Sequence, residues 1–262
     1  MLDHCINDTL RLQYNPDGSS LRDYQLHLVG MLYDFDNICN QIGVNYWLSQ
    51  GTALGAIRHG GFIPWDDDID VEMTYSDFMK FRKKFVETER YALQNIHTDP
   101  MYPLPFAKFR DKKTAIYGKG HGVSSYYKYQ GPFIDIFYTE YSFKGVSKFI
   151  NYFFVISASC VARFGDKKIA YPFIFLFKHF GEVLSNMARV LLKPFPGQKY
   201  GLGYGSHFYD VKSDIRDIFP LKRHIFETHT FPVPNNCDGY LRTIYGDYMR
   251  IPKDIERKTH LD

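Results

Sequence analysis

The sequence predicts an α/β or α+β fold that carries a helical, aromatic-rich insertion. Two observations predict it. Segments with apolar residues at helical spacing alternate along the chain with short segments in which apolar and polar residues alternate as in strands. Between residues 144 and 199 this interleaving stops, and two long aromatic, apolar segments follow each other. With 262 residues, of which 45% are hydrophobic, the chain can bury a substantial core.

The first helix is expected at residues 21–42. Apolar residues recur there at spacings of three and four, which places them on one face of a helix. Ser20 and Asp23 have the spacing of an N-terminal cap, and Gly43 is suited to end the helix.

The elements that follow are shorter. A helix at 52–59 is expected to stop at Gly60 and Gly61, and a helix at 74–89 has three phenylalanines on one side. The expected strands are the segments 45–50, 68–73, 91–96, 106–110 and 131–138.

The segment 144–199 is apolar, aromatic and basic. Its longest stretch without a charge, 149–162, has 14 residues, which is shorter than the roughly 20 residues that span a bilayer. The segment contains nine basic and two acidic residues, which is an excess of seven positive charges. Two interpretations stay open: helices buried as ordinary core, or helices that lie on an anionic membrane surface.

Composition excludes several classes of function. A net charge of +3 without a Lys/Arg-rich block gives no sign of nucleic-acid binding. The N-terminal residues lack the basic start and apolar core of a signal peptide, so a cytoplasmic protein is expected. The cysteines have no spacing that indicates a zinc cluster or a disulfide framework; they are Cys5, Cys39, Cys160 and Cys237.

The stretch IPWDDDID places four carboxylates in five positions, where like charges repel one another. On a strand, Asp66, Asp68 and Asp70 would share one face, with Asp67 and Ile69 on the other. Two carboxylates at positions i and i+2 of one strand face can hold Mg²⁺ or Mn²⁺ through hard oxygen ligands. A solvated acidic turn is the alternative interpretation.

Two further features accompany the carboxylates. Gly51 and Thr52 lie where a strand passes into a helix, a place where backbone amides can bind phosphate. Arg58 and His59 follow on that helix and are further candidates for phosphate contact, although a histidine there can equally act as a capping residue.

A third carboxylate, Asp135, is the only charge within the apolar strand segment PFIDIFY. An unpaired charge among apolar residues is costly, so Asp135 requires a partner. A helix dipole or an arginine would suffice. The preferred interpretation is a metal ion shared with Asp68 and Asp70.

Together these residues resemble the LicD/fukutin family, which carries a signature of the type GTxLGAxRHxGFIPWDDDID. This chain reads GTALGAIRHGGFIPWDDDIDVEM at 51–73. The likeness also covers ICNQIGVNYWLSQ at 38–50, FAKFRDKKT at 106–114, FIDIF at 133–137, and FE, YLRTIYGDYMRIPKD and a final histidine within 226–260. The segment 144–199 has no family signature.

The resemblance implies a nucleotidyltransferase-like mixed sheet flanked by helices. Residues 1–262 would form a single catalytic domain with 144–199 as a helical insertion. Carried over by position, the family's metal site corresponds to Gly51 and Thr52 and to the carboxylates Asp68, Asp70 and Asp135. The clustered cysteines of the animal zinc-binding members are missing, so the chain resembles the compact bacterial type.

The resemblance also implies a reaction. A phosphoalcohol, with phosphocholine as the first choice, would move from a CDP-linked donor such as CDP-choline to a hydroxyl of a glycan or lipid-linked oligosaccharide, and CMP would leave. Such acceptors occur in lipopolysaccharide, teichoic acid or capsule synthesis. The enzyme would work in the cytoplasm, and on the inner face of the cytoplasmic membrane if 144–199 binds lipid.

In this hypothesis Mg²⁺ or Mn²⁺ bridges the donor diphosphate, and Arg58, Lys108 and Arg110 compensate its charge. Asp135 or Asp66 would accept the proton of the acceptor hydroxyl. Trp65 and His260 are the last two candidate site residues. Trp65 with nearby tyrosines would cup a quaternary ammonium, against the alternative of core packing, and His260 matches a family position near the C-terminus.

Three alternatives are kept. A nucleotidyltransferase that activates a phosphoalcohol or sugar phosphate would use the same metal site but release pyrophosphate. A metal-dependent glycosyltransferase also uses an Asp-x-Asp pair, although the GTALGAIRH block argues against it. A non-catalytic membrane-surface protein is disfavoured, since all three carboxylates are present.

Overall fold

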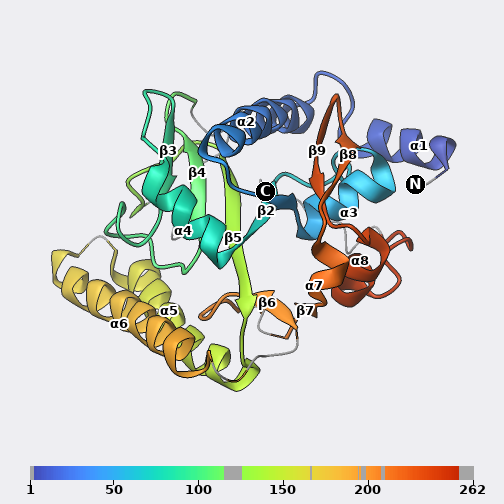
Figure 1. The fold of residues 1–262 in the computed structure, drawn as a ribbon. Helices are drawn as coiled ribbons and strands as arrows, with labels where there is room; N and C mark the ends of the chain where they lie inside the picture. Colours follow the sequence, from blue (N-terminus) through green and yellow to red (C-terminus); the bar gives the residue numbers. More distant parts are fainter. Residues whose placement is uncertain are drawn as a thin grey trace.

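The computed structural model describes residues 3–114, 126–165, 167–193, 195, 199–207 and 210–253. A mixed sheet in the order β1-β2-β5-β4-β3 forms its centre, with β6 beside the end of β5 and β7 beside β6 (Figure 1). Among the described strands, β2 and β5 pair in parallel and the other neighbours are antiparallel. The strands are β1 (Trp47–Leu48), β2 (Asp70–Thr74), β3 (Tyr91–Gln94), β4 (Ala107–Asp111), β5 (Phe133–Tyr141), β6 (Tyr200–Leu202) and β7 (Lys212–Ser213). The expected α/β class is confirmed.

Helices surround this sheet, and a two-stranded hairpin stands beside it. The helices are α1 (His4–Tyr14), α2 (Ser20–Ile42), α3 (Gln50–His59), α4 (Tyr75–Lys84), α5 (Lys144–Phe164), α6 (Tyr171–Leu191), α7 (Ile215–Ile218) and α8 (Cys237–Tyr245), with a 3₁₀ turn at Lys168–Ala170. The hairpin consists of β8 (Lys222–Phe226) and β9 (His229–Val233). Sequence patterns did not predict α1, α7, α8 or this hairpin.

The two faces of the sheet differ in character. One face is apolar and packs under α2 and α4, where Phe35 of α2 contacts both Phe81 of α4 and Phe109 of β4. Because side chains alternate along a strand, the residues next to Phe109 point to the other face. That face carries Lys108 and Arg110, and it packs against α8 where the Tyr240 hydroxyl donates to the carboxylate of Glu72. The polar face therefore holds the candidate site.

Several predicted boundaries shift. The N-cap of α2 is Ser19, not Ser20, because the Ser19 hydroxyl accepts from the Arg22 N–H. Gly43 ends α2 in the left-handed conformation, as expected. The helix expected at 74–89 stops at Lys84, and the strand expected at 45–50 is reduced to the two residues of β1.

The helices α5 and α6 pack against each other at one side of the sheet, where β5 ends (Figure 1). They occupy most of the segment 144–199, of which residues 166, 194 and 196–198 lie outside the described part. The main hydrophobic core contains no buried residue of either helix among those described; their buried hydrophobic residues belong to two small separate clusters. Neither helix therefore covers the apolar face of the sheet.

Candidate active site

The centre of the site is the pairing of β2 with β5, which places Asp70 directly opposite Asp135. Asp66 and Asp68 precede β2 and are partly accessible, whereas Asp67 and Ile69, the residues that follow them, are buried. This alternation agrees with the predicted common face of Asp66, Asp68 and Asp70. Burial raises the pKa of Asp70 well above its usual range, and the nearby charges of Asp68, Asp135 and Asp66 raise it further.

One ammonium group stands among these carboxylates. Lys108 is the partner of Asp135 on β4, and its Nζ lies 2.5 Å from Asp135 Oδ1. Burial lowers the pKa of Lys108, while the Asp135 charge opposes this shift. Lys108 and the nearby Arg110 supply two positive charges against the four carboxylates of Asp66, Asp68, Asp70 and Asp135. Such a set of hard oxygen donors fits Mg²⁺ or Mn²⁺.

Arg110 lies on the same sheet face as Lys108 but makes different bonds. Its Nε donates to Gln94 Oε1 at 2.8 Å, and a terminal nitrogen donates to the carbonyl of Gly131 at 2.6 Å. The ring of Phe133 lies under both cations, 3.5 Å from Lys108 Nζ and 4.4 Å from Arg110 Cζ. Both cations are thus held in fixed positions beside Asp135.

The first turn of α3 is bonded to the start of β2. The Thr52 hydroxyl accepts from the Asp70 N–H at 2.8 Å, and the Ser49 N–H donates to the Asp70 carbonyl at 3.0 Å. A Cβ added to Gly51 would lie 3.0 Å from Asp66 Oδ2, so glycine permits this close approach. The positive end of a helix therefore lies against the acidic stretch.

Arg58 and His59 are both buried and bonded within the protein. Arg58 donates to His59 Nε2 and to the carbonyl of Tyr248, at 3.0 and 2.6 Å. His59 Nδ1 then donates to Asn7 Oδ1 at 2.6 Å, since its other nitrogen accepts. Burial, assisted by the Arg58 charge, lowers the pKa of His59 to about 3, so the ring is neutral. Arg58 and His59 connect α3 to the C-terminal segment and to α1, and phosphate contact by either stays a prediction.

Trp65 is buried and makes an edge-to-face contact with Tyr14 at a centroid distance of 5.3 Å. This placement matches the core-packing alternative. Two tyrosines interact electrostatically with the carboxylates. Burial raises the pKa of both phenols, and the charge of Asp135 raises that of Tyr102 further, as those of Asp70, Asp66 and Asp68 do for Tyr245. Tyr245 is 42% exposed.

Comparison with known proteins identifies the family. A sequence model of the LicD/FKTN/FKRP nucleotidyltransferase domain matches residues 43–170, a range that includes all three carboxylates. Residues 43–170 therefore form a domain of the LicD/fukutin family. The chain is a phosphotransferase of the LicD type.

Individual relatives support this membership over different lengths. The chain is 29% identical over 266 residues to the lipopolysaccharide cholinephosphotransferase LicD of Haemophilus influenzae, covering 92% of this chain and 96% of that protein. It is 41% identical over 58 residues to the human ribitol 5-phosphate transferase FKRP, covering 22% of this chain and 10% of that protein. The yeast mannosyltransferase regulator 4 is 36% identical over 52 residues, which are 20% of this chain and 4% of that protein.

In this LicD-family chain, Glu227 is a positioning residue that sequence reasoning missed. Its side chain is 4% exposed and accepts from Arg22 at 2.7 Å, from Arg11 at 3.2 Å and from the Phe62 N–H at 3.0 Å. A Cβ on Gly61 would lie only 2.2 Å from Glu227 Oε1. Glu227 thereby fixes the turn between α3 and the acidic stretch, from a hairpin more than 150 positions away in the sequence.

Tyr24, Tyr102, Tyr127 and Tyr245 were missed as well. Burial is the main cause that raises the pKa of each phenol, and each also interacts with at least one aspartate of the acidic group. Tyr245 lies within the stretch YLRTIYGDYMRIPKD, which belongs to the family likeness, whereas nothing distinguishes the other three among the 21 tyrosines of the sequence. His260 lies outside the described residues.

Proposed function

We propose that this chain transfers a phosphoalcohol, phosphocholine first, from a CDP-linked donor to a hydroxyl of a cell-surface glycan precursor, with release of CMP. The observation that carries the proposal is the pairing of Asp70 with Asp135, with Asp68 near Asp70 and Lys108 bonded to Asp135, beside the first turn of α3. The similarity to the Haemophilus cholinephosphotransferase over 92% of the chain supports the choice of alcohol and of a glycan acceptor.

Mg²⁺ or Mn²⁺ held by Asp68, Asp70 and Asp135 would supply positive charge to the diphosphate of the donor. The chain's own groups would do the rest. Lys108 adds a buried positive charge beside Asp135, and the first turn of α3 directs its partial positive charge toward the same region. These groups are fixed by the sheet and by α3, so they require little reorganisation during transfer.

In the proposed step, the acceptor hydroxyl oxygen forms a bond to the phosphorus of the phosphoalcohol. The bond from that phosphorus to the bridging oxygen breaks, and its electron pair leaves with CMP. The hydroxyl proton passes to a carboxylate. The candidates for this carboxylate are Asp66, which lies against the first turn of α3, and Asp135, whose Oδ1 accepts from Lys108.

A quaternary ammonium group on the alcohol would contact an aromatic ring beside the acidic residues. Tyr245 is 42% exposed, lies near Asp66, Asp68 and Asp70, and carries a phenol that is neutral at ordinary pH. A neutral aromatic ring can bind a quaternary ammonium through its face. We therefore assign to Tyr245 the contact that sequence reasoning gave to Trp65, which packs against Tyr14.

The test is to identify the leaving group. Purified protein with Mg²⁺ and a glycan acceptor should release CMP from CDP-choline, and the parallel donors CDP-ethanolamine, CDP-glycerol and CDP-ribitol define the alcohol. Pyrophosphate released from CTP and phosphocholine would instead identify a nucleotidyltransferase. UDP or GDP released from nucleotide sugars would identify a glycosyltransferase. Either result overturns the proposal.

A further inference from the structure

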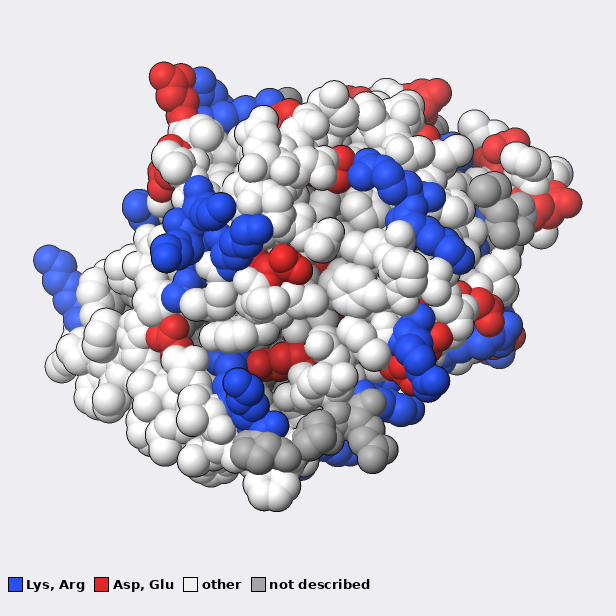
Figure 2. Space-filling view, in the orientation of Figure 1, with Lys and Arg blue, Asp and Glu red and all other residues white. Residues whose placement is uncertain are grey.

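The surface of α5 and α6 is unusually apolar. Of the 24 large hydrophobic side chains that are exposed among the described residues, 15 lie between positions 149 and 195. In Figure 2 the lower-left part of the molecule, which α5 and α6 occupy in Figure 1, is largely free of charged residues. Exposed apolar patches of this extent mark a surface that contacts a partner or a membrane.

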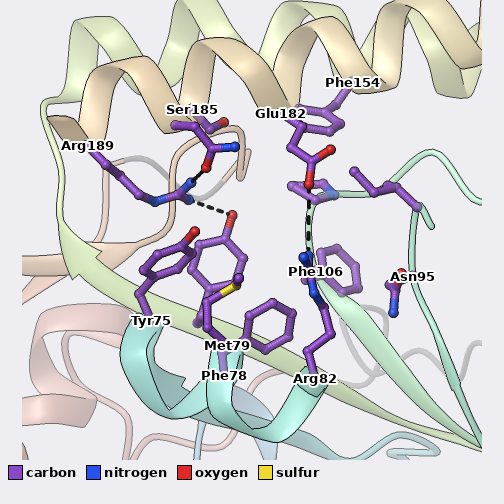
Figure 3. Close-up of a pocket in the computed structure, with 14 residues that line it drawn as sticks. Tyr75, Phe78, Met79, Arg82, Asn95, Phe106, Phe154, Glu182, Ser185 and Arg189 are labelled. Atoms are coloured by element: carbon purple, nitrogen blue, oxygen red, sulfur yellow. Dashed lines mark hydrogen bonds and ion pairs between the residues drawn. The ribbon is translucent and has the colours of Figure 1, made fainter. Parts of the chain in front are cut away.

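Helix α6 has its polar side turned toward the protein. Lys178, Glu182, Ser185 and Arg189 follow each other at spacings of four and three, so they share one helix face. Figure 3 shows Glu182, Ser185 and Arg189 directed toward the pocket between α6 and α4. The opposite face has the same spacing and is exposed: Phe173, Leu176, Phe180, Val183, Met187 and Val190, with exposures of 45 to 72%. A surface helix of a globular protein normally has the reverse arrangement.

The inward polar groups are all bonded, which fixes this orientation. Lys178 is 1% exposed and donates to the carbonyls of Asp99 and Pro100 at 3.0 and 2.8 Å. Arg189 makes a two-pronged contact with Glu140 of β5, at 2.7 and 3.0 Å. Rotating α6 to bury its apolar face would break these contacts and leave buried charges unpaired.

Glu182 adds a third tie between α6 and the rest of the chain. Its carboxylate is bonded to His97, at 2.6 Å, and to His179, at 3.2 Å. His97 follows β3, so this contact joins α6 to the sheet region. The inward face of α6 is therefore fastened at three positions, Lys178, Glu182 and Arg189, along about three turns of the helix.

Helix α5 packs against α6 and also exposes apolar side chains. Its buried residues are Ser147, Ile150, Phe154, Ser157 and Val161, and the Ser157 hydroxyl donates to the Ile174 carbonyl of α6. Phe149 and Tyr152 are 59% and 61% exposed. Among the described helices, α5 is long and apolar enough to cross a membrane by length and composition, and 28% of the qualifying window is buried. Its packing against the fastened α6 instead favours a position along the membrane surface.

The basic residues of the helix pair α5 and α6 complement a negatively charged surface. Those near the helix ends are exposed, namely Lys144, Lys148, Arg163, Lys167, Lys168 and Lys193. Lysine and arginine beside an apolar helix face attract anionic lipid headgroups while the apolar side chains insert. A second copy of this chain would present the same positive charge, so charge complementarity favours lipid.

The geometry points to the α5–α6 hairpin as an interfacial anchor that inserts its outer apolar face into an anionic lipid bilayer, at the inner face of the cytoplasmic membrane. The anchor is linked to the candidate site. Lys178 binds the carbonyls of the loop that carries Tyr102, and Tyr102 lies near Asp135. The site is therefore held close to the membrane, where a lipid-linked acceptor would lie. The membrane contact itself does not depend on which phosphoalcohol is transferred.

Co-sedimentation with phosphatidylcholine vesicles, with and without phosphatidylglycerol, tests the anchor. The wild type should sediment with the anionic vesicles and dissociate as salt is raised. Lys167→Glu with Lys168→Glu should weaken the partition about tenfold or more, because each basic residue near the surface contributes on the order of 1 kcal/mol. Leu176→Gln with Val190→Gln should weaken it comparably through lost apolar insertion.

A matched control substitutes equally exposed apolar residues elsewhere. Leu12 and Val86 are 74% and 78% exposed, and Leu12→Gln with Val86→Gln should bind vesicles as the wild type does. All variants should keep CMP release with a soluble acceptor, which separates the anchor from the proposed reaction. Wild-type protein that stays in the supernatant with anionic vesicles at low salt would overturn the anchor. The anchor would also be overturned if the wild type formed a dimer and did not bind vesicles, and if Leu176→Gln with Val190→Gln dissociated that dimer.

Discussion

Asp70 on β2 and Asp135 on β5 are direct partners across the one parallel pair among the described strands. They are separated by 65 positions in the sequence, and Lys108 approaches Asp135 from β4, which pairs with β5 on its other side. Two carboxylates brought side by side by strand pairing repel each other unless a cation lies between them. The repulsion between Asp70 and Asp135 therefore destabilises the site when no cation is bound, and it favours the binding of a divalent ion.

The first prediction concerns the carboxylates. Asp68→Asn or Asp70→Asn should nearly abolish phosphoalcohol transfer. Without added metal, Asp70→Asn should leave the melting temperature unchanged or raise it, because repulsion within the acidic group is relieved. CMP release and thermal unfolding measure the two effects. Asp8→Asn on exposed α1 is the control and should change neither. Ordinary turnover by Asp70→Asn would remove this residue from the site.

Lys108 supplies a second test. Lys108→Met should destabilise the fold by about 3 kcal/mol, since it leaves Asp135 without its buried partner. Mg²⁺ should then raise the melting temperature of the variant more than that of the wild type, because added positive charge replaces the lost ammonium. Equal shifts in both proteins would contradict a metal site at Asp135.

The contact between Gly61 and Glu227 can be tested by a double-mutant cycle. Gly61→Ala should cost about 1 to 3 kcal/mol, because its Cβ would overlap a carboxylate that two arginines hold in place. In a Glu227→Ala background the same change should cost much less. Gly30→Ala is the control, since a Cβ there meets no atom within 4 Å. Additive costs in urea unfolding would show that the two positions do not interact.

His59 gives a pH dependence with a defined sign. The pKa of His59 is about 3 in the folded protein, against 6.5 for an unperturbed histidine side chain. Between pH 6.5 and 3 the unfolded state therefore binds a proton that the folded state does not bind. The free energy of unfolding should fall as the pH drops from 6.5 toward 3, by on the order of 4 kcal/mol.

The corresponding variant isolates this effect. His59→Gln should flatten that part of the stability profile, whatever its cost at neutral pH. His4→Gln, on the exposed first turn of α1, should leave the slope unchanged. A slope that persists in His59→Gln would assign the acid sensitivity to other groups.

The sequence by itself determined the local features. The spacing of apolar residues predicted α2, and Gly43 and Gly60 ended α2 and α3 because glycine adopts the left-handed conformation without a steric cost. The alternation of Asp66, Asp68 and Asp70 was predicted from the strand period, and the family followed from contiguous residues. These properties depend on neighbours along the chain, which a sequence displays directly.

Only the tertiary structure decided the rest. The pairing of Lys108 with Asp135 and the hold of Glu227 on Gly61 join residues that are far apart in the chain, so no local pattern marks them. The same reason applies to α6. Its sequence shows an apolar face and a polar face, but which face meets the protein depends on partners such as Asp99 and Glu140 that lie on other elements. Long-range packing fixed that orientation, and with it the apolar face that α5 and α6 expose.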